Sequence, residues 1–215
     1  MPRAKQRTPA LRDRVLDTAV ATLADGGVAG FTTRRIAQGA ATSLPAVYEL
    51  FGDKAGLVRE VFFEGFRQLR RRFDALVASD DPLADLEGVV DALRGFVGEK
   101  PFLAEVMFSR PFADFGPGPE DLLATGSVRQ FIVGQVRRCV DAGLLAGDET
   151  DIAHVLVALA QGLAAQETAG WLGTSSASVD RRWALALRAV LDGLAPAGDD
   201  RGFAVRGEKR GRLSP

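Results

Sequence analysis

The chain has very few of the residues that build disulfides and metal sites. Its 215 residues include one cysteine and one histidine. A lone cysteine cannot form an internal disulfide, so the sequence favours a reducing compartment, and we expect a cytoplasmic protein. We interpret Cys139 as a small core residue rather than a reactive thiol. No second histidine or paired cysteine accompanies His154, so we expect no metal site and interpret His154 as a core or interface residue.

The sequence also lacks an apolar run long enough to cross a membrane. Its longest apolar stretch, residues 152–165, is shorter than the roughly 18 to 20 residues that a transmembrane helix needs. His154 and Gln161 interrupt this stretch, which favours a buried helix. The N-terminal residues are basic and no apolar run follows them, so we expect no signal peptide and no membrane partner.

Catalytic motifs are absent as well. The sequence contains no Glu-x-x-His pair, no glycine-rich phosphate loop after a strand and no Ser/His/Asp set. We therefore expect a protein that is not an enzyme, with no catalytic residue and no cofactor.

What the chain does have is an uneven distribution of charge. Residues 1–72 contain 13 Lys and Arg against 7 Asp and Glu, whereas the remainder contains 14 against 21. A basic head on an acidic body favours a protein that touches a polyanion with one end only. A chance distribution of solvated charge is the alternative interpretation.

Two short helices and the start of a third form the strongest local pattern. Thr32 and Ser43 are each placed to cap a helix, because their hydroxyl groups can accept a free backbone N–H. Pro45 falls in the first turn of the second helix, where a missing N–H costs little. The Gly-Ala-Ala sequence at residues 39–41 predicts a tight turn between these helices, and a third helix begins at Lys54. Helix, tight turn and helix is the geometry that places one exposed helix in a DNA major groove.

This order of residues resembles the N-terminal DNA-binding domain of the TetR family of bacterial transcription regulators. The matching pieces, within residues 10–60, are Gly26-Gly27, Phe31-Thr32, Ile36-Ala37, Ser43, Val47-Tyr48 with Phe51, and Lys54 with Leu57. The resemblance implies an all-α fold, in which an N-terminal three-helix helix-turn-helix domain precedes a C-terminal helical ligand-binding and dimerisation bundle. We expect a DNA-binding domain with a basic arm at residues 1–53, an effector-binding and dimerisation domain at 54–196 and a disordered tail at 197–215.

The DNA contacts are expected at the N-terminal ends of the helices, which carry free backbone N–H groups and reach the groove. The resemblance adds Tyr48 and Lys54 as phosphate contacts, although a purely structural Tyr48 is the alternative. The basic arm either contacts DNA or is a solubilising tail; its residues are Arg3, Lys5, Arg7, Arg12 and Arg14. The predicted DNA-binding residues are Thr33, Arg34, Arg35, Thr42, Ser43, Leu44, Pro45, Ala46, Tyr48 and Lys54.

Two features depart from the family's pattern. Leu50 stands where the family commonly has His or another aromatic residue, so we expect one of the family's frequent phosphate contacts to be missing. The Leu-Pro-Ala sequence at residues 44–46 offers no bidentate hydrogen bond to a base. We therefore expect the protein to recognise its DNA sequence through contacts with thymine methyl groups, through Thr42, Arg34 or Arg35, and through DNA shape.

Helical periodicity continues through the rest of the chain. Further helices are expected at residues 54–77, 83–98, 101–109, 120–145 with a break near 125, 149–172 and 178–194. In the family the first of these joins the DNA-binding domain to the body. Its arginines at positions 67, 70, 71 and 72 are expected to form a solvated face rather than DNA contacts. The many prolines and glycines of residues 110–119 predict a loop.

Aromatic residues concentrate around that loop. The resemblance implies that they line a cavity for a small apolar or aromatic effector, whereas the residues taken singly are more typical of an ordinary core. The predicted ligand-binding residues are Phe66, Phe96, Phe102, Met107, Phe108, Phe112, Phe131 and Gln135. Glu105 and Arg110 are further polar groups that could orient the guest.

The last two helices are predicted to form a homodimer interface. The helix at residues 149–172 is apolar nearly all round, so it must be covered on both sides. Ala158, Gly162 and Ala165 would let another backbone approach closely, and the final helix would complete a two-fold four-helix interface.

These features predict a DNA-binding transcriptional regulator. We expect a homodimeric repressor that binds a palindromic operator in double-stranded DNA and is released by its effector. The alternative is a helical ligand-binding or scaffold protein whose basic head contacts an acidic protein partner.

Overall fold

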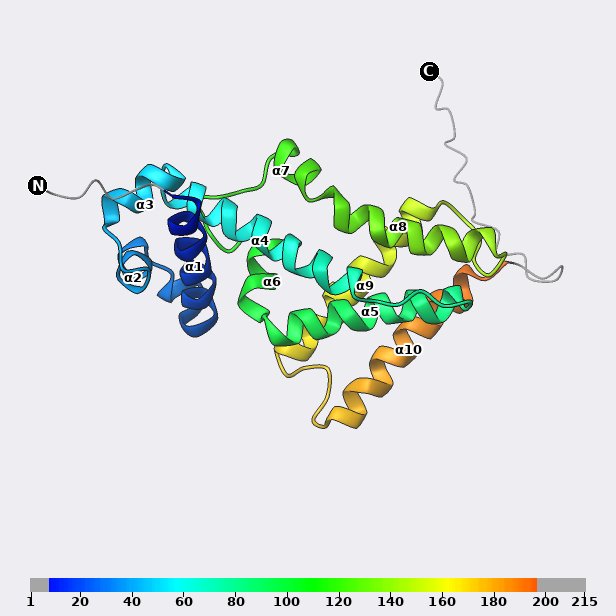
Figure 1. Cartoon of the computed structure of the whole chain (residues 1–215). Helices are drawn as coiled ribbons and strands as arrows, with labels where there is room; N and C mark the ends of the chain where they lie inside the picture. Colours follow the sequence, from blue (N-terminus) through cyan, green and yellow to red (C-terminus); the bar gives the residue numbers. More distant parts are fainter. Residues whose placement is uncertain (1–7, 197–215) are drawn as a thin grey trace, which may run out of the picture.

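The computed structural model describes residues 8–196 and shows ten helices and no strand within that range (Figure 1). The helices are α1 (Pro9–Gly30), α2 (Thr33–Gly39), α3 (Leu44–Phe51), α4 (Lys54–Asp74), α5 (Pro82–Glu99), α6 (Pro101–Phe108), α7 (Pro119–Ala124), α8 (Gly126–Asp141), α9 (Glu149–Thr168) and α10 (Ser176–Leu194). The predicted all-α fold is confirmed. Arg3, Lys5 and Arg7 of the basic arm and the predicted tail at residues 197–215 lie outside the described residues.

Helices α1, α2 and α3 gather at one end of the molecule, and α4 runs from them into the body (Figure 1). The side chains of Thr32 and Ser43 each accept a backbone N–H at the start of α2 and α3, as the sequence predicts, and Thr8 caps α1 in the same way. Asp53 caps α4 by accepting the N–H of Gly56 at 2.7 Å. Apolar residues that recur at helical spacing along α1 pack with residues of α2 and α3 into a three-helix core, and all of them are buried: Leu11, Val15, Leu16, Ala19, Leu23, Ile36, Val47 and Phe51.

The turn between α2 and α3 is tight, but its glycine has a different role from the one expected. Ala41 adopts the positive φ of 50°, whereas Gly39 is the last residue of α2. A Cβ atom on Gly39 would lie 2.7 Å from Cγ2 of Thr18. Glycine at this position therefore lets α2 pack closely against α1.

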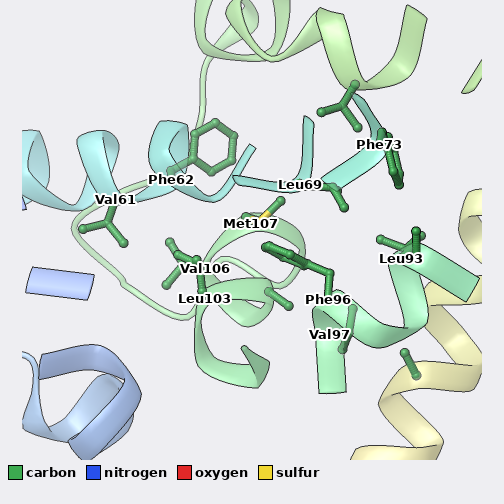
Figure 2. Packing of buried hydrophobic residues seen from close by; sticks show 14 of the residues in the cluster. Val61, Phe62, Leu69, Phe73, Leu93, Phe96, Val97, Leu103, Val106 and Met107 are labelled. Carbon is green, nitrogen blue, oxygen red and sulfur yellow. The ribbon is translucent and has the colours of Figure 1, made fainter. Parts of the chain in front are cut away.

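The core of the body forms where α4, α5 and α6 meet (Figure 2). Phe62 and Leu69 of α4, Phe96 of α5, and Leu103 and Met107 of α6 lie together there and are buried. The α4 arginines pair with carboxylates, which agrees with the predicted solvated face: Arg67 and Arg71 with Glu64, Arg70 with Asp74, and Arg72 with Glu99. The last of these pairs also connects α4 to α5.

The second half of the body is built from α7 to α10. The predicted break near Thr125 separates α7 from α8. Cys139 is buried as expected, its thiol donates to the carbonyl of Pro82 at 3.2 Å, and burial raises the pKa of this thiol. His154 does not belong to the core of this chain: it is exposed on α9, with Nδ1 2.9 Å from the carbonyl oxygen of Thr150. None of the described helices is both long and apolar enough to cross a membrane.

Candidate nucleic-acid interface

The helix-turn-helix presents most of the predicted DNA-binding side chains to solvent. The exposed ones are Arg34, Arg35, Ser43, Pro45 and Tyr48, and the partly exposed ones are Thr33, Leu44 and Lys54. All of them except Tyr48, which lies further along α3, come from the N-terminal ends of α2, α3 and α4, where backbone N–H groups without helical partners favour a phosphate. The fold therefore brings these residues together at the end of the molecule formed by α1, α2 and α3 (Figure 1).

Tyr48 and Thr33 form a hydroxyl pair that joins α3 to the first residue of α2. The hydroxyl of Tyr48 lies 3.2 Å from Oγ1 of Thr33, and 40% of Tyr48 remains exposed. This contact fixes the direction of the phenol without burying it. A hydroxyl held in this way can donate to a DNA phosphate while its ring stays against the protein.

Lys54 is held by the loop between α6 and α7. Its Nζ lies 3.9 Å from Oδ2 of Asp114 and 5.4 Å from the ring centroid of Phe112. Phe112 is itself buried and packs on Phe31 at the end of α1, with 5.1 Å between the ring centroids. The body thus touches the helix-turn-helix at a predicted phosphate contact. The sequence does not reveal this relationship, because nothing in the local pattern shows where a proline- and glycine-rich loop will dock.

Two of the predicted DNA-binding residues differ from the others. Ala46 is only 8% exposed and packs on the buried side of α3. The hydroxyl oxygen of Thr42 is enclosed and has no hydrogen-bond partner among the described residues. A buried hydroxyl without a partner costs about 1–3 kcal/mol, so Thr42 would gain from any rearrangement that brought it to a partner. In this conformation Ala46 is buried, whereas Thr42 is partly exposed but turns its hydroxyl oxygen away from solvent.

Two arginines assigned to the basic arm instead support the motif from within α1. Nε of Arg14 donates to the carbonyl oxygen of Ala40 at 3.1 Å, which ties α1 to the turn between α2 and α3. The guanidinium of Arg12 lies 5.1 Å from the ring centroid of Phe51 and pairs with Glu60 at 2.7 Å. The sequence did contain a signal for this, because Thr8 and Pro9 are typical of a helix start and place both arginines inside the helix.

Away from this interface, a cleft of about 380 Å³ lies between α5, α6 and α9. Phe102 and Phe108 of α6 line it, with Glu105 between them and Gln161 and Thr168 on the α9 side. A second cleft, of about 370 Å³, lies between α1 and the junction of α5 with α6, and Phe102 lines this one too. Both volumes fall in the range of small-molecule sites, about 300–1,000 Å³.

The other predicted ligand-binding residues lie away from the first cleft. Phe96 and Met107 are buried in the core, Phe66 packs on Phe62 and Phe108, Phe112 packs on Phe31, Phe131 stacks on Phe73, and Gln135 accepts a hydrogen bond from Arg138. The structure therefore does not bring all eight predicted residues around one cavity. Aromatic clustering in the sequence did not separate rings that line a cleft from rings that fill the core.

Two family models match the chain. The model described as bacterial regulatory proteins, tetR family, matches residues 15–61, which run from α1 into α4. The model described as tetracyclin repressor-like, C-terminal domain, matches residues 86–190, which run from α5 into α10. A search of curated protein sequences found no match to the chain.

Several solved structures share the fold. A protein of unknown function from Rhodococcus sp. RHA1 is 26% identical, with a TM-score of 0.74 over 91% of this chain and 100% of that one. A Streptomyces coelicolor protein described as a transcriptional regulator is also 26% identical, with a TM-score of 0.60 over 86% of this chain and 98% of that one. The TetR family transcriptional regulator PfmR from Thermus thermophilus is 19% identical, with a TM-score of 0.58 over 82% and 98%. The chain therefore belongs to the TetR family of bacterial regulatory proteins, and it is a transcriptional regulator with a helix-turn-helix DNA-binding domain.

Proposed function

We propose that the protein is a homodimeric repressor that binds a palindromic operator in double-stranded DNA and leaves it when a small apolar or aromatic effector binds the body. Residues 1–53 would form the DNA-binding domain and residues 54–196 the effector-binding and dimerisation domain. The observation that carries the proposal is the exposed end of α3, flanked by the Thr33–Tyr48 pair. A capped helix end with polar groups around it fits a major groove bordered by phosphates.

The outer face of α9 and α10 supports the dimer. Val155 of α9 is 49% exposed and Leu185 of α10 is 67% exposed, although both are apolar. Ala158, Gly162 and Ala165 are exposed along α9, where they leave room for a second backbone. A second copy of the chain on this face would cover these residues. The two copies of α3, held about 34–36 Å apart in such a dimer, would then enter successive major grooves of the DNA.

The position of Phe102 supports the proposal that effector binding releases the protein from DNA, because this residue connects the clefts to the DNA-binding domain. Its ring atoms lie 3.1–3.4 Å from the position that a Cβ on Gly27 would occupy. Gly27 is the non-helical residue inside α1, with φ of 58°. A ligand that moves Phe102 would therefore shift the end of α1. Such coupling typically amounts to about 1–3 kcal/mol, and it works only as far as the ligand binds the two conformations differently.

Selection of bound duplexes from a random pool, followed by sedimentation of the purified chain with and without the selected duplex, tests this proposal. We expect a two-fold symmetric site bound by two copies of the chain. A chain that stays monomeric at micromolar concentration and binds no duplex in low salt would contradict the proposal. That outcome would favour the alternative of a basic head that contacts an acidic protein.

A further inference from the structure

One face of α6 carries a carboxylate between two aromatic rings. Phe102, Glu105 and Phe108 follow one another at intervals of three residues, so they lie on the same side of the helix. All three line the cleft of about 380 Å³ between α5, α6 and α9. Gln161 and Thr168 add neutral polar groups to the opposite wall.

The carboxylate of Glu105 has no counter-charge in the described part of the chain. The residue is half-buried, and no hydrogen bond or ion pair reaches its side chain from any residue in the range 8–196. None of the residues that line this cleft is Lys or Arg. Two neighbouring acidic residues differ in this respect, because Glu99 pairs with Arg72 and Glu167 pairs with Arg94.

Arg94 on α5 and Lys100 between α5 and α6 are engaged elsewhere, and Arg110, just beyond α6, is exposed and does not line this cleft. Arg94 binds Glu167 and Asp180, both at 2.8 Å. Lys100 donates to the side-chain oxygen of Gln68 at 2.7 Å. Neither residue is positioned as a partner for Glu105, so the charge that this cleft presents to a guest is negative.

We propose that this cleft selects an organic cation, with an aromatic or apolar body and one positive charge beside Glu105. The inference rests on the proposed function in treating this cleft as the effector site. A half-buried carboxylate loses part of its hydration, and a ligand cation replaces that lost stabilisation. Phe102 and Phe108 line the same cleft as the carboxylate, and aromatic rings attract organic cations as well. An anionic guest would meet repulsion from Glu105 and would find no basic residue on the cleft walls.

Three probes with the same naphthalene body separate charge from shape. They are the cation trimethyl(2-naphthylmethyl)ammonium, the neutral 2-naphthylmethanol and the anion 2-naphthylacetate. Isothermal titration calorimetry on the full chain without DNA gives their affinities. We expect the cation to bind about tenfold more tightly than the alcohol. The anion should bind most weakly of the three.

The variant Glu105→Gln keeps the shape of the side chain and removes its charge. We expect it to bind cation and alcohol within about twofold of each other. The matched control is Glu87→Gln on α5, which makes the same charge change at an exposed residue outside the clefts. This control should retain the full preference for the cation, and circular dichroism melts should show that both variants fold.

Three outcomes would overturn the proposal: no binding of the cation at millimolar concentration, equal binding of cation and alcohol to the unchanged chain, or an unchanged preference in Glu105→Gln. The proposed function is tested separately, by adding the cation to the chain bound to its selected duplex. A cation that binds with the expected preference but leaves the duplex in place contradicts effector release and supports the cation site.

Discussion

The carboxylate of Asp114 lies 3.9 Å from the ammonium group of Lys54, so an acidic residue of the body faces a predicted phosphate contact at the start of α4. Both side chains are well exposed, at 68% and 41%, and their attraction is therefore weak, about 0–1 kcal/mol. A DNA phosphate and Asp114 would compete for the same ammonium group. The loop between α6 and α7 can in this way moderate DNA affinity without touching DNA.

Asp114→Asn is accordingly expected to tighten DNA binding. The variant frees Lys54 and removes one negative charge near the interface, so the affinity should rise about two- to fivefold in low salt and the gain should shrink as salt increases. Fluorescence anisotropy with a labelled duplex measures the change. Asp80→Asn in the loop between α4 and α5 is the control and should have little effect. An affinity that falls or stays constant in Asp114→Asn would show that this pair does not oppose binding.

Tyr48→Phe and Lys54→Gln should both weaken binding to every duplex, but with different salt dependence. The tyrosine hydroxyl is neutral, so its loss should lower affinity about three- to tenfold and leave the slope of log affinity against log salt unchanged. Loss of the lysine charge should reduce that slope by about one. Salt titrations on two unrelated duplexes measure both effects. If Tyr48→Phe binds like the unchanged chain, Tyr48 is a structural residue.

Gly39→Ala and Ala41→Gly should change stability in opposite directions. The new methyl group of Gly39→Ala meets Cγ2 of Thr18, which lies 2.7 Å from that position, so the variant should lose about 1–3 kcal/mol. Ala41 has φ of 50°, and glycine there should gain up to about 1 kcal/mol by relieving strain. Urea unfolding of the two variants measures both values. Adding Thr18→Ser, which removes Cγ2, should restore the loss in Gly39→Ala, and failure to do so would refute the close-approach argument.

Phe102→Ala should loosen the end of α1. Its ring packs against Gly27, the residue that interrupts the helix, so the amides of residues 26–30 should exchange with deuterium several-fold faster in the variant. Hydrogen-exchange mass spectrometry of the whole chain measures this. Phe108→Ala provides the matched control, because Phe108 lines the same cleft but packs on Phe66 of α4. Equal exchange at the end of α1 in both variants would contradict the proposed coupling of the cleft to α1 through Phe102 and Gly27.

The Arg94–Glu167 pair should make stability depend on pH in the acid range. Hydrogen bonding from Arg94 is the main cause that lowers the pKa of Glu167 below its ordinary value of 4.5, and the indole N–H of Trp183 also donates to Glu167 at 2.7 Å. A carboxyl group with a lowered pKa stabilises the folded chain above its ordinary pKa, and this contribution is lost as pH falls through the lower value. Glu167→Gln should therefore be less stable than the unchanged chain at pH 7, by about 1 kcal/mol after allowing for solvent screening.

That stability difference should narrow as the pH falls below the ordinary carboxyl pKa of 4.5 and through the lower pKa of Glu167 in the folded chain. Urea unfolding of both proteins at several pH values measures it, with Glu87→Gln, at an exposed position, as the control. A constant difference across this range would mean that Glu167 is not linked to acid unfolding.

Local signals along the chain are enough to place the helix starts and to show which helices form the DNA-binding domain. Helix starts depend on a hydroxyl or carboxylate that accepts a backbone N–H two or three residues later, so Thr8, Thr32 and Ser43 could be recognised from their own neighbours. The apolar face of α1 followed from helical periodicity, and the order of these local signals sufficed to recognise the family.

Which side chains meet across the molecule depends instead on how the helices pack. The approach of Asp114 to Lys54, the packing of Phe102 on Gly27 and the hydrogen bond from Arg14 to Ala40 join residues that are distant in the chain. Periodicity shows that a ring will be buried, but it does not distinguish a ring in a core from a ring in a cleft wall. The unpaired state of Glu105 likewise depends on where every basic side chain ends, and that is a property of the folded chain as a whole.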